Sequence, residues 1–313
     1  MIGRVGTAWW LGAALLLAGC SAGRTAPGLP HPSPKPPTGP YVALGDSYTA
    51  GLQLEPAASG GPKGCGRSGV NYPSLVARDL GIAAADFTDV SCSGATTADL
   101  TAAQQVAGGA NPAQLDALNS RTRLVTLGIG GNDADFTKVV TQCAEQGLPQ
   151  ALLAALDRKE AQGSPCRASY TAADGQDRLT ALLDTVGDRL AGVLQEVRRR
   201  APQARVYLVG YPALLPADPA GCRAVLGSAM VPGDLGFIAE KEQQLNTVLA
   251  DRAKAAGVGF VDTYKPSAGH DMCAGQATRW VEPPFPAAGR APLHPNAAGQ
   301  QAMANAVAAA IRG

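Results

Sequence analysis

Two residues far apart in the chain are of the types that carry nucleophilic catalysis. Ser47 lies in GDSYTAG (residues 45–51), after a short apolar run, and His294 lies in RAPLHPNAAGQ (residues 290–300) near the C-terminus. A serine hydroxyl becomes a nucleophile when a base takes its proton, and histidine is the usual base. The motif is not the G-x-S-x-G nucleophile elbow, because Thr49 occupies the second glycine position. The alternative for Ser47 is a helix cap without chemistry.

Two further motifs offer hydrogen-bond donors to a negatively charged oxygen. Gly94, in SCSGATTADL (residues 91–100), has no side chain, so its backbone N–H can approach a ligand closely, although Ser-Gly turns are also common without a function. Asn132 lies in GIGGNDADF (residues 128–136), which superficially resembles a dinucleotide-binding turn. Asp133 stands at the third glycine position of such a turn, and its charge would repel a pyrophosphate. We therefore interpret the Asn132 amide as the donor.

The elements that would position these residues alternate along the chain from Tyr41 onward. Short apolar runs predict strands, and the segments between them have helical periodicity. The predicted strands are 41–45, 85–92, 123–130, 204–212 and 258–264, and the predicted helices are 71–80, 112–119, 174–200, 234–256 and one starting at about Asn296. This alternation predicts an α/β domain with a parallel sheet covered on both faces. The motifs fall at the carboxyl ends of the strands, where ligands bind in such sheets.

The first twenty residues have the pattern of a secretory signal peptide. Arg4 precedes an apolar run from Val5 to Gly19, which is shorter than the roughly 20 residues that span a bilayer as a helix. The run ends in LAGC, which resembles the bacterial lipobox, where the cysteine is acylated. We expect residues 1–19 to be a lipoprotein signal peptide and Cys20 to be lipidated. The exported protein would then lie on the outer face of the cytoplasmic membrane. Release into the medium is the alternative location. The alternative is an ordinary signal peptide with a chance cysteine.

The six cysteines beyond Cys20 are an even number, which suits three disulfides outside the cytoplasm. Neighbour pairing is the choice that closes each loop within one βα unit. It gives Cys65–Cys92, Cys143–Cys166 and Cys222–Cys273. A metal site is the alternative, but the spacing contains no C-x-x-C or C-x-x-H pattern, so we expect no metal and no cofactor. The connections 133–172, 213–233 and 265–293 are long and bear cysteines, which makes them candidate walls of a site.

Composition limits the partners that the protein could have. Apolar residues make up 46% of the chain, enough for a substantial core, and the formal net charge of +1 gives no sign of a nucleic-acid partner. The basic cluster at 198–200 ends a predicted helix, where cations favourably meet the macrodipole. Residues 20–40 are rich in proline and predict a semi-rigid spacer before the domain at 41–313. We expect a monomer that meets the membrane through lipidated Cys20.

Together, the blocks around Ser47, Gly94, Asn132 and His294 resemble the SGNH hydrolase family, also called the GDSL lipases and esterases, in the order that the family has them. The resemblance runs from Tyr41 to the last helix. The six domain cysteines and the GHDMC segment are similar to the secreted actinobacterial lipase branch. The resemblance implies a three-layer α/β/α sandwich with a flavodoxin-like, five-stranded parallel sheet. It also implies an enzyme that hydrolyses carboxylic esters.

The resemblance and the residue chemistry assign the same roles. Ser47 would be the nucleophile and His294 the base, while the backbone N–H groups of Ser47 and Gly94 and the Asn132 amide would form an oxyanion hole. His270 is the other histidine of the domain, but its neighbour Asp271 is adjacent in sequence, and adjacent side chains on an extended loop usually diverge.

The family's usual acid stands three residues before the histidine, and this sequence has Ala291 there. The acid normally accepts a hydrogen bond from Nδ1 of the histidine and fixes its tautomer. A backbone carbonyl can do the same, so we expect a Ser47–His294 dyad oriented by the carbonyl of Ala291 or Pro292. The alternative is a carboxylate from elsewhere in the sequence, namely Asp262, Asp271 or Glu282.

Three functions remain open on the sequence alone. The first is hydrolysis of ester substrates, either lipids or small acyl esters, by a membrane-tethered lipase or esterase. The second is removal or transfer of acetyl or acyl groups on cell-wall glycans. The third is a non-catalytic lipoprotein that binds a ligand in the same cleft, although binding alone would not require a nucleophile, a base and oxyanion donors together. Acyl chain length is not predicted.

Overall fold

The computed structural model describes residues 2–3, 6, 36–157, 162–226 and 230–313. By its internal contacts the chain divides into residues 1–33 and 34–313, and the second unit contains every helix, strand and disulfide described below. The predicted signal peptide cleavage site, Cys20 and most of the proline-rich spacer lie outside the described residues. Within these ranges, no helix is long and apolar enough to cross a membrane.

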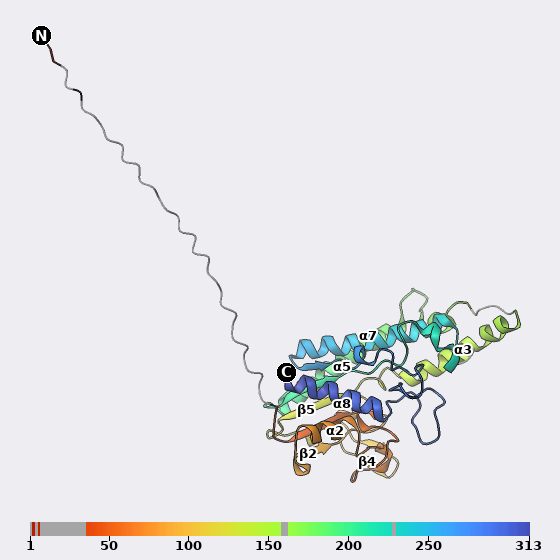
Figure 1. Cartoon of the computed structure of the whole chain (residues 1–313). Helices are drawn as coiled ribbons and strands as arrows, with labels where there is room; N and C mark the ends of the chain where they lie inside the picture. The colour runs from red at the N-terminus through yellow and green to blue at the C-terminus, as the bar shows by residue number, and fades with distance from the viewer. Residues whose placement is uncertain (1, 4–5, 7–35, 158–161, 227–229) are drawn as a thin grey trace. The chain divides into compact units, whose positions relative to one another are not determined.

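A five-stranded parallel sheet forms the centre of the domain (Figure 1), which confirms the predicted fold class. Its strand order is β2-β1-β5-β6-β7, so the central position belongs to β5. The strands are β1 (Tyr41–Gly45), β2 (Phe87–Asp89), β5 (Leu124–Gly128), β6 (Arg205–Val209) and β7 (Gly259–Val261). All neighbouring pairs are parallel, with Tyr41 opposite Leu124 and Gly45 opposite Gly128. The carboxyl ends of β1 and β5 therefore lie side by side.

Helices cover both faces of the sheet. One face packs against α5 (Arg178–Arg200) and α7 (Pro232–Ala256), and the other against α2 (Tyr72–Asp79) and α8 (Ala297–Arg312). Alternation along β1 supplies both cores, since successive side chains of a strand point to opposite faces. Val42 and Leu44 belong to the first core, whereas Tyr41 and Ala43 belong to the second.

One predicted helix is wrong in type. The segment 112–119 forms only a single 3-10 turn, η4 (Gln114–Ala117). The Gln114 side chain holds the turn in place, because it accepts a hydrogen bond from the Gly45 amide (2.7 Å) and donates one to the Gly45 carbonyl (2.9 Å). Leu118 is already extended, since the chain must enter β5 a few residues later.

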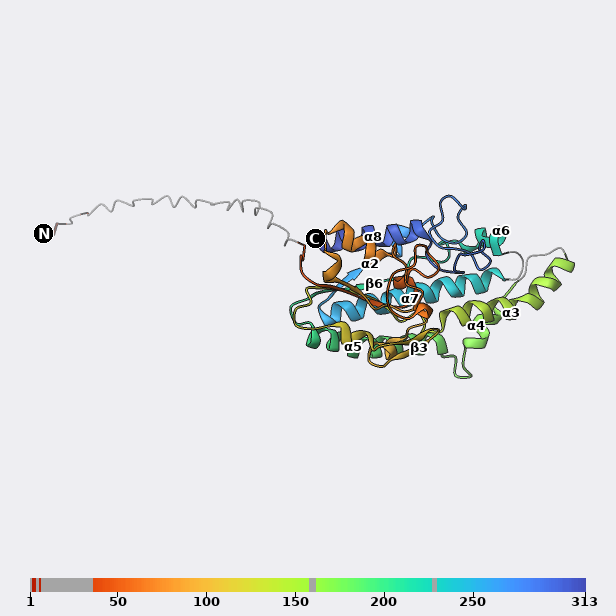
Figure 2. The same cartoon turned by 90° about the horizontal axis from the view of Figure 1, so that it is seen from below.

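The connection 133–172 contains helices that the sequence analysis did not predict. They are α3 (Phe136–Leu156) and α4 (Pro165–Tyr170). Pro149 lies inside α3 and Gly147 precedes it, and both residues weaken the helical signal of a sequence. Figures 1 and 2 show the second half of α3 extending beyond the rest of the domain. A short hairpin, β3 (Gln104–Val106) with β4 (Gly109–Asn111), was also not predicted.

Three disulfides fasten the long connections. Their pairs are Cys65–Cys92, Cys143–Cys166 and Cys222–Cys273, the same three that neighbour pairing gives. The second joins α3 to α4, and the third joins the connection 213–233 to the connection 265–293.

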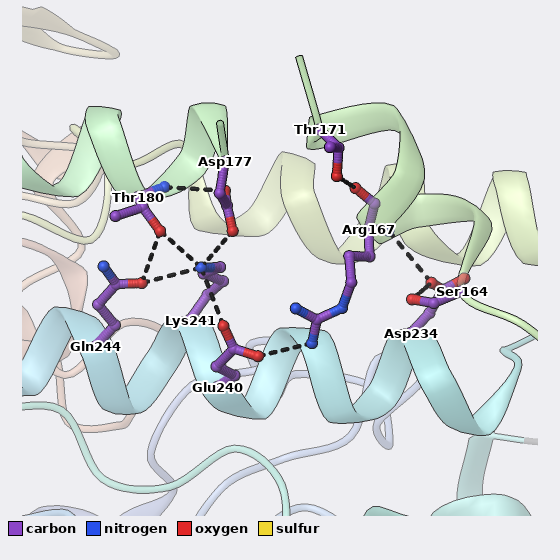
Figure 3. A network of polar contacts seen from close by, with 9 residues as sticks. All are labelled: Ser164, Arg167, Thr171, Asp177, Thr180, Asp234, Glu240, Lys241 and Gln244. Atoms are coloured by element: carbon purple, nitrogen blue, oxygen red, sulfur yellow. Dashed lines mark hydrogen bonds and ion pairs between the residues drawn. The ribbon is translucent and has the colours of Figure 1, made fainter. Parts of the chain in front are cut away.

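A buried lysine joins α5 to α7, as Figure 3 shows. The Lys241 ammonium is 2.5 Å from an Asp177 carboxylate oxygen and donates to Gln244 at 3.0 Å. It also lies 3.2 Å from Glu240, which in turn pairs with Arg167 of α4 at 2.6 Å. A buried charge is tolerated only when it is paired and hydrogen-bonded, and Lys241 meets both conditions. These contacts hold α4, α5 and α7 in one layer.

Candidate active site

Ser47 is the first residue of α1 (Ser47–Ala50), directly beyond the carboxyl end of β1. Asp46 caps this helix, because its side chain accepts a hydrogen bond from the Tyr48 amide at 2.9 Å. The amide of a first helical residue has no partner within the helix, so the Ser47 N–H remains a donor. Gly45 makes the tight turn possible. A Cβ there would lie 2.3 Å from the Thr49 hydroxyl and 2.5 Å from the Gly128 carbonyl oxygen.

His294 contacts the Ser47 hydroxyl directly. Its Nε2 lies 2.7 Å from Ser47 Oγ, and its Nδ1 lies 2.6 Å from the Pro292 carbonyl oxygen. A carbonyl can only accept, so Nδ1 carries the proton and Nε2 is free to accept the proton of Ser47. Of the two expected carbonyls, the structure places that of Pro292 at the ring. The Ala291 carbonyl instead accepts the backbone N–H of His294 at 3.4 Å.

The residue between Pro292 and His294 explains how the carbonyl reaches the ring. Leu293 has φ +61°, a left-handed conformation that is unfavourable for a branched side chain. Neighbouring groups hold it there. The Tyr48 hydroxyl donates to the Leu293 carbonyl at 2.5 Å, and the Leu293 amide donates to the Glu282 carbonyl at 3.0 Å. The strained turn brings the carbonyl of residue 292 back onto the side chain of residue 294.

The three carboxylates considered as alternatives are engaged elsewhere. Asp262 accepts the backbone amides of residues 264 and 265, and Asp271 accepts the Cys273 amide. The Glu282 carboxylate is buried between two arginine side chains, at 2.9 Å and 2.5 Å. His270 is also separate from the site, since its ring stacks on Trp280 with centroids 4.0 Å apart. In the part of the chain that the structure describes, the hydrogen bonds of the His294 ring go to Pro292 and Ser47.

Gly94 and Asn132 line the same cavity as Ser47 and His294. Gly94 has φ +76°, a conformation that glycine adopts without strain. Asn132 donates one amide hydrogen to the Ala95 carbonyl at 2.9 Å, which orients the side chain and leaves the other hydrogen as a donor. The predicted oxyanion donors therefore surround one space beside the Ser47 hydroxyl.

Asp133 has a role that the sequence analysis missed. Its buried carboxylate accepts both the backbone amide and the hydroxyl of Thr97, at 2.9 Å and 2.5 Å. It thereby ties the loop that bears Gly94 to the turn that bears Asn132. The sequence hint of this role is the position of Asp133 next to Asn132. In the sequence analysis, that position served only as an argument against a phosphate site.

Tyr211 was also missed, because a tyrosine at the end of a buried strand resembles an ordinary core residue. Its hydroxyl donates to the Asp46 carboxylate at 2.6 Å and accepts from the Gly131 amide at 2.9 Å. It thus bridges the turn before Ser47 and the turn before Asn132. Burial raises the pKa of Asp46 to about 6, while the hydrogen bonds from Tyr211 and from the backbone of Tyr48 act to lower it.

Burial also sets the protonation of the histidine. It lowers the pKa of His294, and the hydrogen bond to the Pro292 carbonyl acts in the opposite direction. A base must be neutral to accept a proton, so the lowered pKa keeps His294 competent at neutral pH.

The cavity beside Ser47 has a volume of about 210 Å³. Much of its wall is apolar and comes from Leu52, Phe136, Val140, Leu214 and Leu245. Glu242 also lines the cavity, and burial raises the pKa of its carboxyl well above the ordinary value, while backbone hydrogen bonds from Leu214 and Leu215 act to lower it. An engineered apolar cavity of about 150 Å³ holds a benzene molecule, so this cavity can take a larger apolar group.

The described residues contain one cluster of possible metal ligands, Cys222, Asp271 and Cys273. Its two sulfur atoms form a disulfide with each other and so cannot bind a metal as thiolates. In the cavity, the His294 ring is hydrogen-bonded to the Ser47 hydroxyl rather than grouped with other possible metal ligands of the described residues.

Comparison with known proteins shows the family to which the chain belongs. Residues 43–302 match the GDSL-like Lipase/Acylhydrolase family. Lipase 2 of Streptomyces coelicolor is 37% identical over 276 residues, covering 87% of this chain and 86% of that protein. The lipase of Streptomyces rimosus is 34% identical over 262 residues, covering 84% of this chain and 81% of that protein.

Solved structures give the same result. A phospholipase A1 from Streptomyces albidoflavus NA297 is similar with a TM-score of 0.66 and 30% identity, covering 87% of this chain and 98% of that chain. An extracellular lipase from Streptomyces rimosus is similar with a TM-score of 0.67 and 29% identity, covering 87% of this chain and 99% of that chain. The chain therefore belongs to the GDSL-like lipase/acylhydrolase family, and it is a carboxylic ester hydrolase.

Proposed function

We propose that this enzyme hydrolyses lipid esters through a Ser47–His294 dyad whose histidine is oriented by the Pro292 carbonyl. The observation that carries the proposal is the pair of distances at the His294 ring, 2.7 Å from Nε2 to Ser47 Oγ and 2.6 Å from Nδ1 to the Pro292 oxygen. The first gives the nucleophile its base, and the second fixes the tautomer that the base needs.

The reaction would proceed in two halves. His294 Nε2 takes the hydroxyl proton as Ser47 Oγ attacks the ester carbonyl carbon, and the carbonyl oxygen becomes an oxyanion. The amides of Ser47 and Gly94 and the Asn132 side chain donate to that oxygen. His294 then gives its proton to the departing alkoxide, which leaves as an alcohol. A water molecule, deprotonated by His294, then attacks the acyl-serine. The bond between the acyl carbon and Ser47 Oγ breaks, His294 returns the proton to that oxygen, and the carboxylic acid leaves.

The neutral dyad differs from a triad in how it supports the charged histidine. A carboxylate would stabilise the imidazolium by a charge-assisted hydrogen bond, about twice as strong as a neutral one. The Pro292 carbonyl offers the imidazolium a dipole rather than an opposite charge, so it stabilises the charged histidine less than a carboxylate would.

The substrate class follows from the cavity and the relatives. The apolar wall beside Ser47 suits an acyl chain longer than acetyl, and relatives named lipase and phospholipase A1 support a lipid ester. An acetyl group on a glycan would leave most of this wall without a partner. We therefore favour lipid hydrolysis over deacetylation of glycans.

We also propose that the enzyme is exported and held at the membrane by an acylated Cys20, on the basis of the LAGC sequence after the apolar run. Growth of a producing strain with an alkyne fatty acid would label the wild-type chain. The variant Cys20→Ser would not be labelled, and equal labelling of both would reject the anchor.

The test of the enzymatic proposal is covalent labelling by a fluorophosphonate probe, followed by hydrolysis of p-nitrophenyl esters of increasing chain length. Ser47→Ala should lose both labelling and hydrolysis while the protein stays folded. Labelling of Ser47→Ala at the wild-type rate would place the nucleophile elsewhere.

A further inference from the structure

The projecting half of α3 carries a row of exposed leucines. Leu148, Leu152, Leu153 and Leu156 are 44%, 57%, 66% and 81% exposed. The first, second and fourth are spaced four residues apart, so they lie along one face of the helix. The large apolar side chains exposed elsewhere in the described part of the chain are Ile2 and Phe285. A concentration of exposed leucines on one helix marks an interaction surface.

The opposite side of the same stretch packs inward through small residues. Gly147 and Ala151, which alternate in sequence with the exposed leucines, are buried. The stretch from Gln146 to Leu156 contains no ionisable side chain. This leucine face (Leu148, Leu152, Leu153 and Leu156) therefore offers apolar area without charges for ion pairs with a protein partner or with anionic headgroups.

The first turns of α3 lie at the active site. Phe136, Thr137 and Val140 line the cavity beside Ser47, and the Cys143–Cys166 disulfide anchors this half of the helix to α4. One continuous helix thus leads from the cavity to the leucine face, and its second half extends beyond the domain (Figures 1 and 2). A lipid aggregate is an extended apolar phase, so it can contact the leucines while one of its molecules enters the cavity.

We infer that the leucine face of α3 docks on the surface of lipid aggregates that hold the ester substrate. Removal of exposed apolar side chains from water drives such docking, as it does for amphipathic helices at a membrane interface. The absence of charge favours neutral or zwitterionic headgroups as the contacted surface. The lipid substrate rests on the proposed function, whereas docking itself can be tested without catalysis.

The experiment uses residues 34–313, which contain the whole core and all three disulfides, so that an acylated Cys20 does not contribute to binding. The variant is Leu152→Gln/Leu153→Gln/Leu156→Gln, since glutamine has a helix propensity close to that of leucine. Co-sedimentation with phosphatidylcholine vesicles should show at least a tenfold weaker partition than the wild type. Hydrolysis of emulsified triacylglycerol should fall at least tenfold, while hydrolysis of soluble p-nitrophenyl butyrate should change less than twofold.

The matched control is Leu152→Met/Leu153→Met/Leu156→Met, which keeps the apolar face and should keep vesicle binding. If the glutamine triple variant does not fold, Leu156→Gln alone tests the most exposed position. Equal vesicle binding by wild type and glutamine variant would overturn the inference, as would a wild type that does not bind. A wild-type dimer that the glutamine exchanges dissociate would assign the face to a second copy and also overturn it. Vesicle binding with no hydrolysis of any ester would instead reject the proposed function.

Discussion

The carbonyl oxygen of Pro292 lies 2.6 Å from Nδ1 of His294, two residues later in the same loop. The base is therefore oriented by its own backbone rather than by a side chain from another element. This arrangement depends on the left-handed conformation of Leu293, which the Tyr48 hydroxyl and the Glu282 carbonyl hold in place.

Tyr48→Phe tests whether that loop conformation matters for turnover. The exchange keeps the ring, which packs 5.0 Å from the His294 ring, but removes the hydrogen bond to the Leu293 carbonyl. A hydrogen bond of this kind contributes about 1 kcal/mol net, so kcat should fall about fivefold with little change in KM. Tyr170→Phe, on α4, is the control and should leave kcat unchanged. An unaltered kcat in Tyr48→Phe would show that the loop keeps its conformation without the tyrosine hydroxyl.

Asn132→Ala removes one of the three proposed oxyanion donors. Loss of such a donor typically costs roughly 3–4 kcal/mol of transition-state stabilisation, so kcat should drop about a hundredfold or more. KM should change little, because the donor acts mainly on the developing charge. Steady-state kinetics on a soluble p-nitrophenyl ester measures both values. A near-normal kcat would remove Asn132 from the site.

The amino-acid sequence predicted the parts of the site that depend on strand ends. Ser47 and Asn132 follow strands β1 and β5, and the carboxyl ends of parallel neighbours meet at one edge of the sheet. The choice between the Ala291 and Pro292 carbonyls was out of reach, because it depends on the φ angle of Leu293. No local pattern in a sequence gives a strained angle that distant residues maintain.

Other features escaped prediction for related physical reasons. The Tyr211–Asp46 contact joins residues 165 positions apart, and either residue alone looks ordinary in sequence. The helix α3 was hidden by Gly147 and Pro149, because both residue types disfavour a helix interior and weaken its signal in the sequence. The segment 112–119 is the reverse case, because its sequence pattern predicts a helix that does not form. The hydrogen bonds between the Gln114 side chain and the Gly45 backbone hold it in a 3-10 turn instead.

Asp46→Asn should change how stability depends on pH. The pKa of Asp46 is about 6 in the folded protein against an ordinary value of 3.8, so between these pH values the folded state binds more protons than the unfolded state. The free energy of unfolding of the wild type therefore falls as the pH rises through this window, by about 3 kcal/mol from this group. Asparagine caps a helix as well as aspartate does but does not titrate.

Urea unfolding of both proteins at pH 4 and pH 7 measures this effect. The stability of the wild type relative to Asp46→Asn should decline by about 2 kcal/mol between the two pH values, because the carboxyl of the unfolded chain is already partly ionised at pH 4. A constant difference would mean that Asp46 titrates in the folded protein as it does in the unfolded chain.

The pH dependence of catalysis should report the lowered pKa of His294. Activity is lost when the base becomes protonated, and burial lowers the pKa of His294, so the acid limb of kcat/KM should have its midpoint below the ordinary histidine value of about 6.5. Asp46→Asn separates the two titrating groups and should leave this midpoint in place. A midpoint above the ordinary value would indicate a carboxylate beside the ring, which would raise the pKa of the histidine.

The measurement that most directly tests the dyad is kcat of the carboxylate variants Asp262→Asn, Asp271→Asn and Glu282→Gln beside His294→Ala, each checked for folding by circular dichroism. A dyad oriented by the Pro292 carbonyl predicts that His294→Ala loses roughly a thousandfold or more, while each carboxylate variant stays within about tenfold of wild type. A folded carboxylate variant whose kcat falls by several orders of magnitude would contradict the account and restore a triad.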